Sequence, residues 1–480
     1  MTLRAIKLLL SGALVTLSWV SAAQTVEKWD LRKCVEYALQ NNISIKQADL
    51  QSRFSELNFT QAKAGQWPTL NFNSSPGYRF GRSENPTTGV LEDNNFFSLG
   101  MQLQSQVTLF NWFSLKNSVE SSRLNWEADK EQVAKAQNDI ALNVAVGYLQ
   151  ILLAKEQVKL ATVQISGTKE QLEATRKRVD AGALPELNAA ELEAQLARDS
   201  SAFVNAEASE MQLRLQMKAL LNLDASIPFD IIVPTVEQIP VEALADLQPE
   251  AVFASAMANL PQQRVNNLRL RSAQKNVLAA RGNMYPSISA FGGLGTNYVN
   301  VRFPEFAPGP LVTTTSLVTV GGTDYFVQTP SFLKVGEAAV PLGSQFKNNF
   351  GQSIGIGLSI PLLNGRVART GWDRSKLEVK QWELTMEQDK MTLKQDIYKA
   401  YNDATAALQK FNASKKTVET SQKAYDFAQK RYELALLSAL ELLISQNNLL
   451  RAKIDMLYAQ YDFIFKMKLL EFYKGQGIKL

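Results

Sequence analysis

The sequence FSLGMQLQSQVTL, residues 97–109, decides the fold because its apolar and polar side chains alternate. A period of two predicts a β-strand whose successive side chains point to opposite faces. One face carries glycine, serine, threonine and glutamine, and the other carries Phe97, Leu99, Met101 and Leu103. These thirteen residues are enough for a tilted strand to cross a hydrocarbon layer, for which about 9 to 11 suffice.

Three further stretches alternate in the same way and predict three more strands. The clearest sets an apolar row against glycine and serine, and that row is Ile354, Ile356, Leu358 and Ile360. We predict strands at 68–80, 96–110, 286–300 and 350–363. Large aromatic residues such as Trp67, Trp112 and Tyr285 cluster where strands meet helices, as interfacial belts do. We therefore interpret the apolar faces as lipid-facing, although a soluble β-sandwich would show the same alternation.

The composition excludes several classes of function. The 480 residues include no histidine and one cysteine, Cys34, which excludes histidine-based catalysis, histidine metal sites and internal disulfides. Lysine and arginine number 51 against 46 acidic residues, and this near balance gives no argument for nucleic-acid binding. The chain also lacks a Gly-x-x-x-x-Gly-Lys nucleotide loop. We expect no enzyme activity, catalytic residue, cofactor or metal site.

The N-terminal residues 1–23 read as a secretory signal peptide. Arg4 and Lys7 precede an apolar run at 8–20, and Ser21-Ala22-Ala23 supplies the small residues that a signal peptidase reads. We expect cleavage after Ala23 and export of the remainder. No later run of about twenty apolar residues predicts a transmembrane helix.

Most of the remaining chain is expected to be helical and to repeat one unit twice. A heptad series that begins Val144, Ile151 and Val158 reappears 253 positions later, which predicts coiled-coil seams in both halves. The junction Trp67-Pro68 corresponds to Tyr285-Pro286 at an offset of 218. The repeats are 24–235, with helices 29–66, 112–181 and 186–222, and 236–480, with helices 249–284, 365–434 and 438–473. The extra 35 residues of the second repeat fall in 303–349, which we expect to be a long exposed loop.

A four-stranded sheet with one lipid face has two unpaired edges, which a bilayer does not tolerate. Further copies of the chain must then close it. Two copies would give eight strands and a filled lumen, whereas three would give twelve strands and a channel. Small and amide side chains on the polar face favour three copies.

At this point the chain resembles the TolC-like outer-membrane efflux channels of Gram-negative bacteria. The resemblance rests on the early helix at 29–42, on the junctions Trp67-Pro68 and Tyr285-Pro286, and on RYELALLSALELL at 431–443. It implies an α+β membrane protein, a homotrimer whose 12-stranded barrel continues into a helical barrel in the periplasm. It also implies an outer-membrane channel of a tripartite efflux or type I secretion system, which passively conducts substrates received from an inner-membrane pump through a periplasmic adaptor.

The resemblance further assigns roles to residues near the two turns between long helices. The adaptor-contact candidates are Arg178, Gly182, Arg431, Ala435, Leu436 and Ser438. Glu441 falls where many members carry an aperture carboxylate, and Ala435 replaces the usual glycine. For the arginines the alternative is a charge that complements the helix dipole, and for Glu441 it is a solvated helix carboxylate. The alternative function is an exported structural or adhesive coiled-coil protein with a soluble β-sandwich head.

Overall fold

The computed structural model describes residues 28–84, 91–93, 95–233, 242–434 and 436–475. The predicted signal peptide lies outside the described residues. The chain forms two compact units, which we call the sheet unit (58–122 and 273–378) and the helical unit (the rest). In the parts that the structure describes, no helix is both long and apolar enough to span a membrane.

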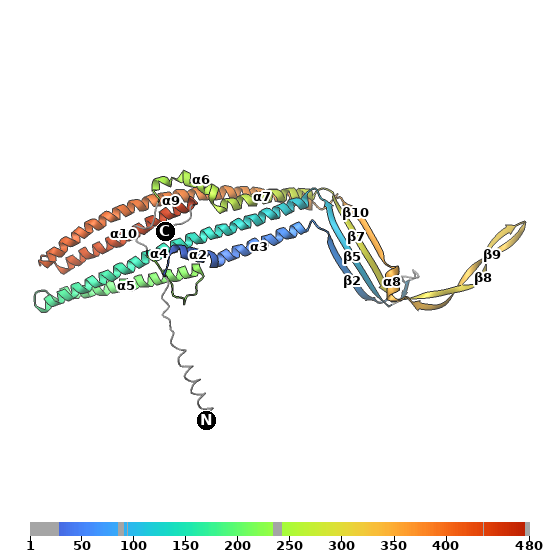
Figure 1. Ribbon diagram of the computed structural model, residues 1–480, viewed down its shortest axis with the longest axis horizontal. Helices are drawn as coiled ribbons and strands as arrows, with labels where there is room; N and C mark the ends of the chain where they lie inside the picture. The colour runs from blue at the N-terminus through green and yellow to red at the C-terminus, as the bar shows by residue number, and fades with distance from the viewer. Residues whose placement is uncertain (1–27, 85–90, 94, 234–241, 435, 476–480) are drawn as a thin grey trace, which may run out of the picture. The chain divides into compact units, whose positions relative to one another are not determined.

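The sheet unit is built on four antiparallel strands in the order β10-β7-β5-β2 (Figure 1). Their bounds are β2 Thr69–Arg79, β5 Phe96–Phe110, β7 Ser287–Val299 and β10 Gly351–Ser359. The strand that we predicted at 350–363 ends earlier in the structure, at Ser359. Pro361 has no backbone N–H to pair, so Ile360 lies just beyond the strand.

The strand register gathers the predicted apolar rows onto a single face. Leu103 pairs with Phe72 on one side and Leu294 on the other. Residues paired in this way share a face, so the alternation of each strand is in phase across the sheet. The opposite face holds Gln102 and Gln104 with the glycines and serines of β10. Within the described ranges, no strand pairs with the outer edges of β2 and β10, and Ile354 on β10 is 93% exposed.

The stretch predicted as a long loop, 303–349, is instead mostly regular structure. It forms a two-stranded ribbon, β8 Arg302–Val320 and β9 Thr323–Ala339, followed by the short helix α8 Leu342–Asn348. Gly321 and Gly322 have positive φ and make the turn at the ribbon tip. The loop prediction was wrong because the prolines and glycines that suggested a loop flank a run rich in threonine and valine at 311–320, and β-branched residues favour strands. A smaller ribbon joins β3 Arg82–Glu84 to β4 Leu91–Asp93.

The long helices form two antiparallel hairpins in the helical unit (Figure 1). Helices α4 Ser114–Asp180 and α9 Val367–Glu433 have 67 residues each and begin 253 positions apart. They are followed by α5 Glu186–Leu221 and α10 Ala439–Tyr473. In the predicted seams, Val144, Ile151 and Ile397 are fully buried. These matching bounds support the proposed repeat.

Each of the two early helices, predicted as continuous at 29–66 and 249–284, is broken into two. The first is α2 Leu31–Asn41 and α3 Ile43–Ala64, and the second is α6 Pro249–Asn259 and α7 Pro261–Gly282. Asn42 adopts an extended conformation and its side chain accepts a hydrogen bond from Ser44 N. Leu260 is extended because it precedes Pro261. The breaks are 218 positions apart, the offset of the repeat in this part of the chain.

Candidate functional site

The first turn between long helices, after α4, is closed by a glycine and by backbone hydrogen bonds to the last turn of the helix. Gly182 has φ +72°, a left-handed conformation that glycine adopts without strain. Ala183 N donates to Arg178 O at 2.8 Å, which satisfies a carbonyl at the helix end. Arg178 thus lies in the last turn of α4, where its charge complements the helix dipole.

The second turn, after α9, repeats this closure with different residues. Leu436 N donates to Arg431 O, also at 2.8 Å, and Leu436 is the counterpart of Ala183 at the offset of 253. The side chain of Leu436 is 65% exposed. Ala435, the counterpart of Gly182, lies outside the described residues. The two arginines therefore occupy equivalent positions in equivalent turns.

Ser438 and Glu441 form a capping box at the start of α10. The Ser438 hydroxyl accepts from Glu441 N, and the Glu441 carboxylate accepts from Ser438 N at 3.0 Å and from Ser438 Oγ at 2.8 Å. The Ser438 backbone N–H, followed by its hydroxyl, lowers the pKa of Glu441. The carboxylate therefore stays ionised at neutral pH and fixes the end of the turn.

Direct contacts connect the first hairpin to the second just above the turns. The Arg178 guanidinium lies over the Tyr432 ring at 5.9 Å, and the Tyr432 and Thr175 hydroxyls are hydrogen bonded at 3.2 Å. A groove of about 400 Å³ beside them is lined by residues of α4, α9 and α10. Among the described residues, neither Gln171 Nε2 nor Gln446 Oε1 in this groove has a hydrogen-bond partner.

A buried polar layer lies farther from the turns and joins three helices. Thr168 on α4 donates to Asp199 on α5 at 2.7 Å, and Gln195 donates to the same carboxylate at 2.8 Å. Gln195 Nε2 also donates to Asn447 on α10 at 3.2 Å. Sequence reasoning missed this layer because polar residues at isolated seam positions resemble exposed ones. Such groups specify the register of packed helices.

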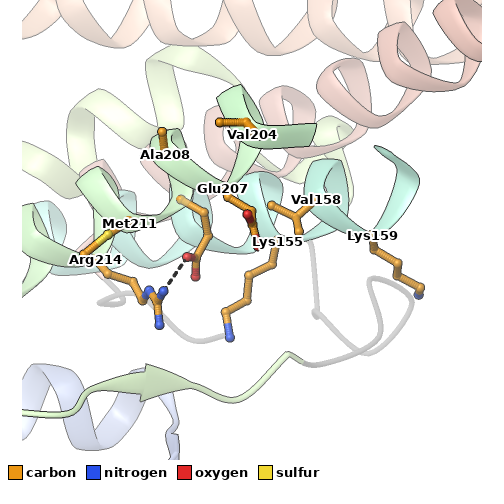
Figure 2. Close-up of a pocket in the computed structure, with 9 residues that line it drawn as sticks. Lys155, Val158, Lys159, Val204, Glu207, Ala208, Met211 and Arg214 are labelled. Atoms are coloured by element: carbon orange, nitrogen blue, oxygen red, sulfur yellow. Dashed lines mark ion pairs between the residues drawn. The ribbon is translucent and has the colours of Figure 1, made fainter. Parts of the chain in front are cut away.

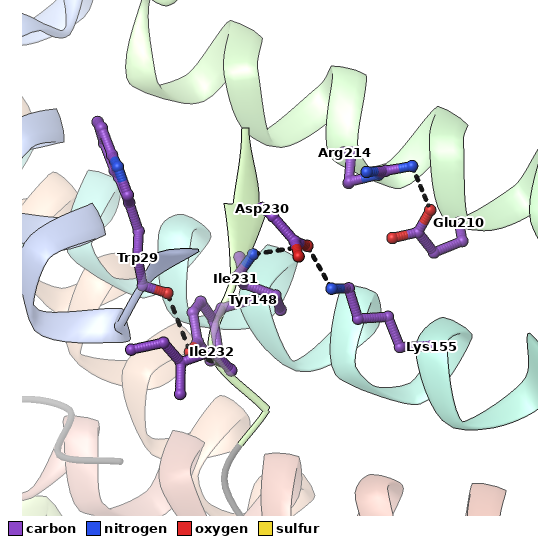
Figure 3. Close-up of polar contacts among 8 residues, drawn as sticks. All are labelled: Trp29, Tyr148, Lys155, Glu210, Arg214, Asp230, Ile231 and Ile232. Carbon is purple, nitrogen blue, oxygen red and sulfur yellow. Dashed lines mark hydrogen bonds and ion pairs between the residues drawn. The ribbon is translucent and has the colours of Figure 1, made fainter. Parts of the chain in front are cut away.

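A second polar cluster joins two short paired strands, β1 Lys28–Trp29 and β6 Asp230–Ile231, to the helices (Figure 3). The hydroxyl of Tyr148, which is 2% exposed, donates to Ile232 O at 2.7 Å. Burial raises the pKa of Tyr148, so the hydroxyl remains a donor. Burial also tends to raise the pKa of Asp230, but hydrogen bonds from Lys155 and from Ile231 N outweigh it and leave that pKa lowered.

A groove of about 700 Å³ lies beside this cluster, between α4 and α5 (Figure 2). Val158, Val204 and Met211 form its apolar lining, and charged groups surround them. Arg214 pairs with Glu210 at 2.8 Å, and Lys155 pairs with Asp230, so these charges are compensated within the chain. Cys34 is buried in the nearby core, and desolvation raises the pKa of its thiol to about 12. Across the described ranges, no three acidic or cysteine side chains are grouped as metal ligands would be.

The sheet thus has one apolar and one polar face, and the two long hairpins end in equivalent turns. The sequence model of the outer membrane efflux protein family matches residues 34–223 and 252–464. The chain belongs to this family. The family, the outer-membrane location and the combination of β-strands with long helices predicted from the sequence are thus confirmed. The three copies and the efflux activity stay predictions. The family and the fold are those of channels, and neither supports an adhesive protein with a sandwich head.

Two outer-membrane proteins are similar to this chain in sequence. The outer membrane efflux protein BepC of Brucella suis biovar 1 is 21% identical over 364 residues, 75% of this chain and 67% of BepC. The probable outer membrane lipoprotein SilC of Salmonella typhimurium is 23% identical over 261 residues, which is 54% of each chain. The chain therefore matches about half the length of SilC.

The structural similarity extends over nearly the whole chain. The crystal structure of CusC superposes with a TM-score of 0.74 at 18% identity, covering 95% of this chain and 94% of CusC. VceC of Vibrio cholerae gives a TM-score of 0.72 at 15% identity, covering 93% of this chain and 96% of VceC. These similarities establish the fold.

Proposed function

We propose that this chain is the outer-membrane channel of a tripartite efflux or type I secretion system, and that three copies form one conduit. The conduit is passive, and an inner-membrane pump delivers substrate through a periplasmic adaptor. The observation that carries the proposal is the four-stranded sheet, which has one apolar and one polar face and two unpaired edges.

The unpaired edges support the homotrimer. In hydrocarbon each free N–H or C=O of an edge strand costs several kcal/mol, so β2 of one copy must pair with β10 of the next. Three sheets of four strands close into twelve. The apolar face, with Leu99, Leu103 and Ile356, then contacts lipid, while Gln102 and Gln104 face the water-filled lumen.

Planar bilayer recording tests this function. Purified protein, extracted in detergent, should insert spontaneously and give stepwise ohmic conductance without nucleotide. The proposal would be contradicted if intact protein binds to bilayers but does not conduct at any voltage tested.

We place the adaptor contact at the two turns, with Arg178, Gly182, Arg431, Ala435, Leu436 and Ser438 as its candidates. Support comes from the equal closure of both turns and from the exposed Leu434 and Leu436 side chains, because paired turns offer the adaptor two similar sites. Leu436→Glu should abolish cross-linking to the adaptor in cells, whereas Leu436→Met should retain it. Equal cross-linking by both variants would remove Leu436 from the contact.

We place Glu441 at the periplasmic aperture, where three copies would form a ring of carboxylates. Its capping bonds keep each carboxylate ionised, and such a ring attracts cations. Cation preference fits the chain's similarity to CusC of Escherichia coli, which is named as a cation efflux system protein. Glu441→Gln should lower the ratio of cation to anion permeability, measured from reversal potentials in a salt gradient. An unchanged ratio would assign the residue to capping alone.

A further inference from the structure

The junction between β10 and α9 carries an exposed basic patch that the channel function does not use. We call it the basic rim patch and define it by Arg366, Arg369, Arg374 and Lys376. Residues 360–377 contain these four basic side chains and a single acidic one, Asp373. The patch therefore keeps a net positive charge.

Contacts within the patch leave most of its charge uncompensated. The carboxylate of Asp373 forms ion pairs with two of the basic residues, with Lys376 Nζ at 3.1 Å and with Arg369 Nε at 3.6 Å. Lys376 Nζ also lies 3.1 Å from the centre of the Trp372 ring, which holds the side chain on the helix surface. The side chain of Arg366 has no partner among the described residues, and it is exposed.

Helix stability does not explain the position of these arginines. The first turn of α9 contains no acidic residue, and Arg366 and Arg369 lie where the helix dipole is positive. Cations at this end of a helix are unfavourable because they meet the positive end of the dipole. Arg366 also has φ +65°, a conformation that a non-glycine residue seldom adopts. An anion bound from outside would relieve the repulsion.

The surroundings of the patch indicate a lipid as the source of that anion. The apolar row of β10 runs through Ile356 and Leu358, and beyond the end of the strand Leu362 and Leu363 are 91% and 96% exposed. Aromatic side chains lie at the same end of the sheet, where the ring centres of Trp112 and Tyr285 are 4.8 Å apart. An apolar band, then an aromatic belt, then basic residues is the order expected across one phospholipid leaflet.

We propose that the basic rim patch binds the headgroups of anionic phospholipids in the leaflet on the helical side of the barrel. The inference rests on the proposed function, because it requires the sheet to lie in a membrane. In the first repeat the counterpart of Arg366 is Phe113, also with positive φ, so that junction is aromatic rather than basic. A trimer would present three basic and three aromatic junctions in alternation around one rim.

Native mass spectrometry of the detergent-solubilised protein tests the proposal, with phosphatidylglycerol and phosphatidylcholine of equal chain length as probes. The wild type should retain phosphatidylglycerol in preference. The triple variant Arg366→Gln/Arg369→Gln/Lys376→Gln should lose about tenfold or more of that preference, because each basic residue near an anionic surface contributes to binding. The control Lys399→Gln/Lys415→Gln/Lys423→Gln removes the same charge from exposed positions of the same helix and should bind like the wild type.

Two further arms separate the possible explanations. Inorganic phosphate should not displace the lipid at millimolar concentration, and displacement would show a free-anion site and overturn the lipid proposal. Equal lipid retention by both triple variants would also overturn it. Bilayer conductance is measured on the same samples: a conducting wild type without lipid preference refutes the patch alone, whereas a wild type that fails to conduct refutes the proposed function.

Discussion

Phe113 and Arg366 share a left-handed backbone conformation, with φ 60° and 65°, and each immediately precedes a 67-residue helix. The residues before them, Trp112 and Gly365, are also left-handed, with φ 52° and 59°. Non-glycine residues seldom adopt this conformation, and three of these four residues are not glycine, so two left-handed pairs at equivalent positions indicate one strand-to-helix corner used twice. The corner supports the internal repeat more directly than residue identity does.

The two faces of β5 should differ in their tolerance of charge. Leu103→Arg should destabilise the folded protein by about 2 to 4 kcal/mol if that face lies at the bilayer midplane. Gln102→Arg, on the opposite face, should fold normally and change conductance. Urea unfolding from lipid vesicles measures the first effect, and bilayer recording the second. Equal stability of the two variants would refute the assignment of the faces.

Gly355 should be intolerant of a side chain because the Phe291 ring covers it. A Cβ added at Gly355 would lie 2.6 Å from Phe291 Cζ, whereas a Cβ at Gly351 on the same strand would meet nothing within 4 Å. Gly355→Ala should therefore cost roughly 1 to 3 kcal/mol and Gly351→Ala much less, measured by unfolding from vesicles. Adding Phe291→Ala should restore part of the loss at Gly355. A loss that persists in the double variant would exclude the ring as its cause.

Two glycines of the first long hairpin should respond oppositely to alanine. Gly182 has φ +72°, so Gly182→Ala should destabilise the turn by about 1 to 2 kcal/mol although its Cβ would have open space. Gly167 lies inside α4 with nothing near its Cβ, so Gly167→Ala should stabilise the helix by roughly 0.5 to 1 kcal/mol. Chemical denaturation followed by circular dichroism compares them. The same sign for both would contradict the assigned conformation of the turn.

The contribution of Glu441 to stability should depend on pH. Its pKa is lowered in the folded protein, so its charge stabilises the fold above the unfolded pKa of about 4.3. That stabilisation is lost as the pH falls through the folded pKa. Wild type and Glu441→Gln should differ in thermal midpoint at pH 7 and converge near pH 3. A gap that is independent of pH would show that the carboxylate charge is not involved.

The strand faces and the long helices could be predicted from the sequence because they depend on local period. Leu103 and Ile356 lie on the apolar face, as their alternation indicates. The helix break at Leu260 could have been predicted from Pro261, which follows it. The break at Asn42 could not, because it depends on hydrogen bonds of the Asn42 side chain with Ser44 N and with Leu220 O. The latter partner lies 178 positions away.

Contacts between distant helices left no signal in the sequence. The hydrogen bond between Thr175 and Tyr432 joins residues 257 positions apart, and the Gln195–Asn447 pair joins residues 252 apart. Both depend on how two hairpins pack, which a periodic pattern does not specify. The basic residues of the rim patch can be read in the sequence. Their position beside the sheet follows only from the structure, in which β10 ends at Ser359.

The native mass of the purified protein in detergent tests the central claim most directly. With two unpaired strand edges in each chain, we expect a complex of three chains that stays intact until the detergent is removed or the protein is denatured. A stable single chain that remains soluble without detergent would contradict the account, because its sheet edges and apolar face would then need no second copy and no lipid.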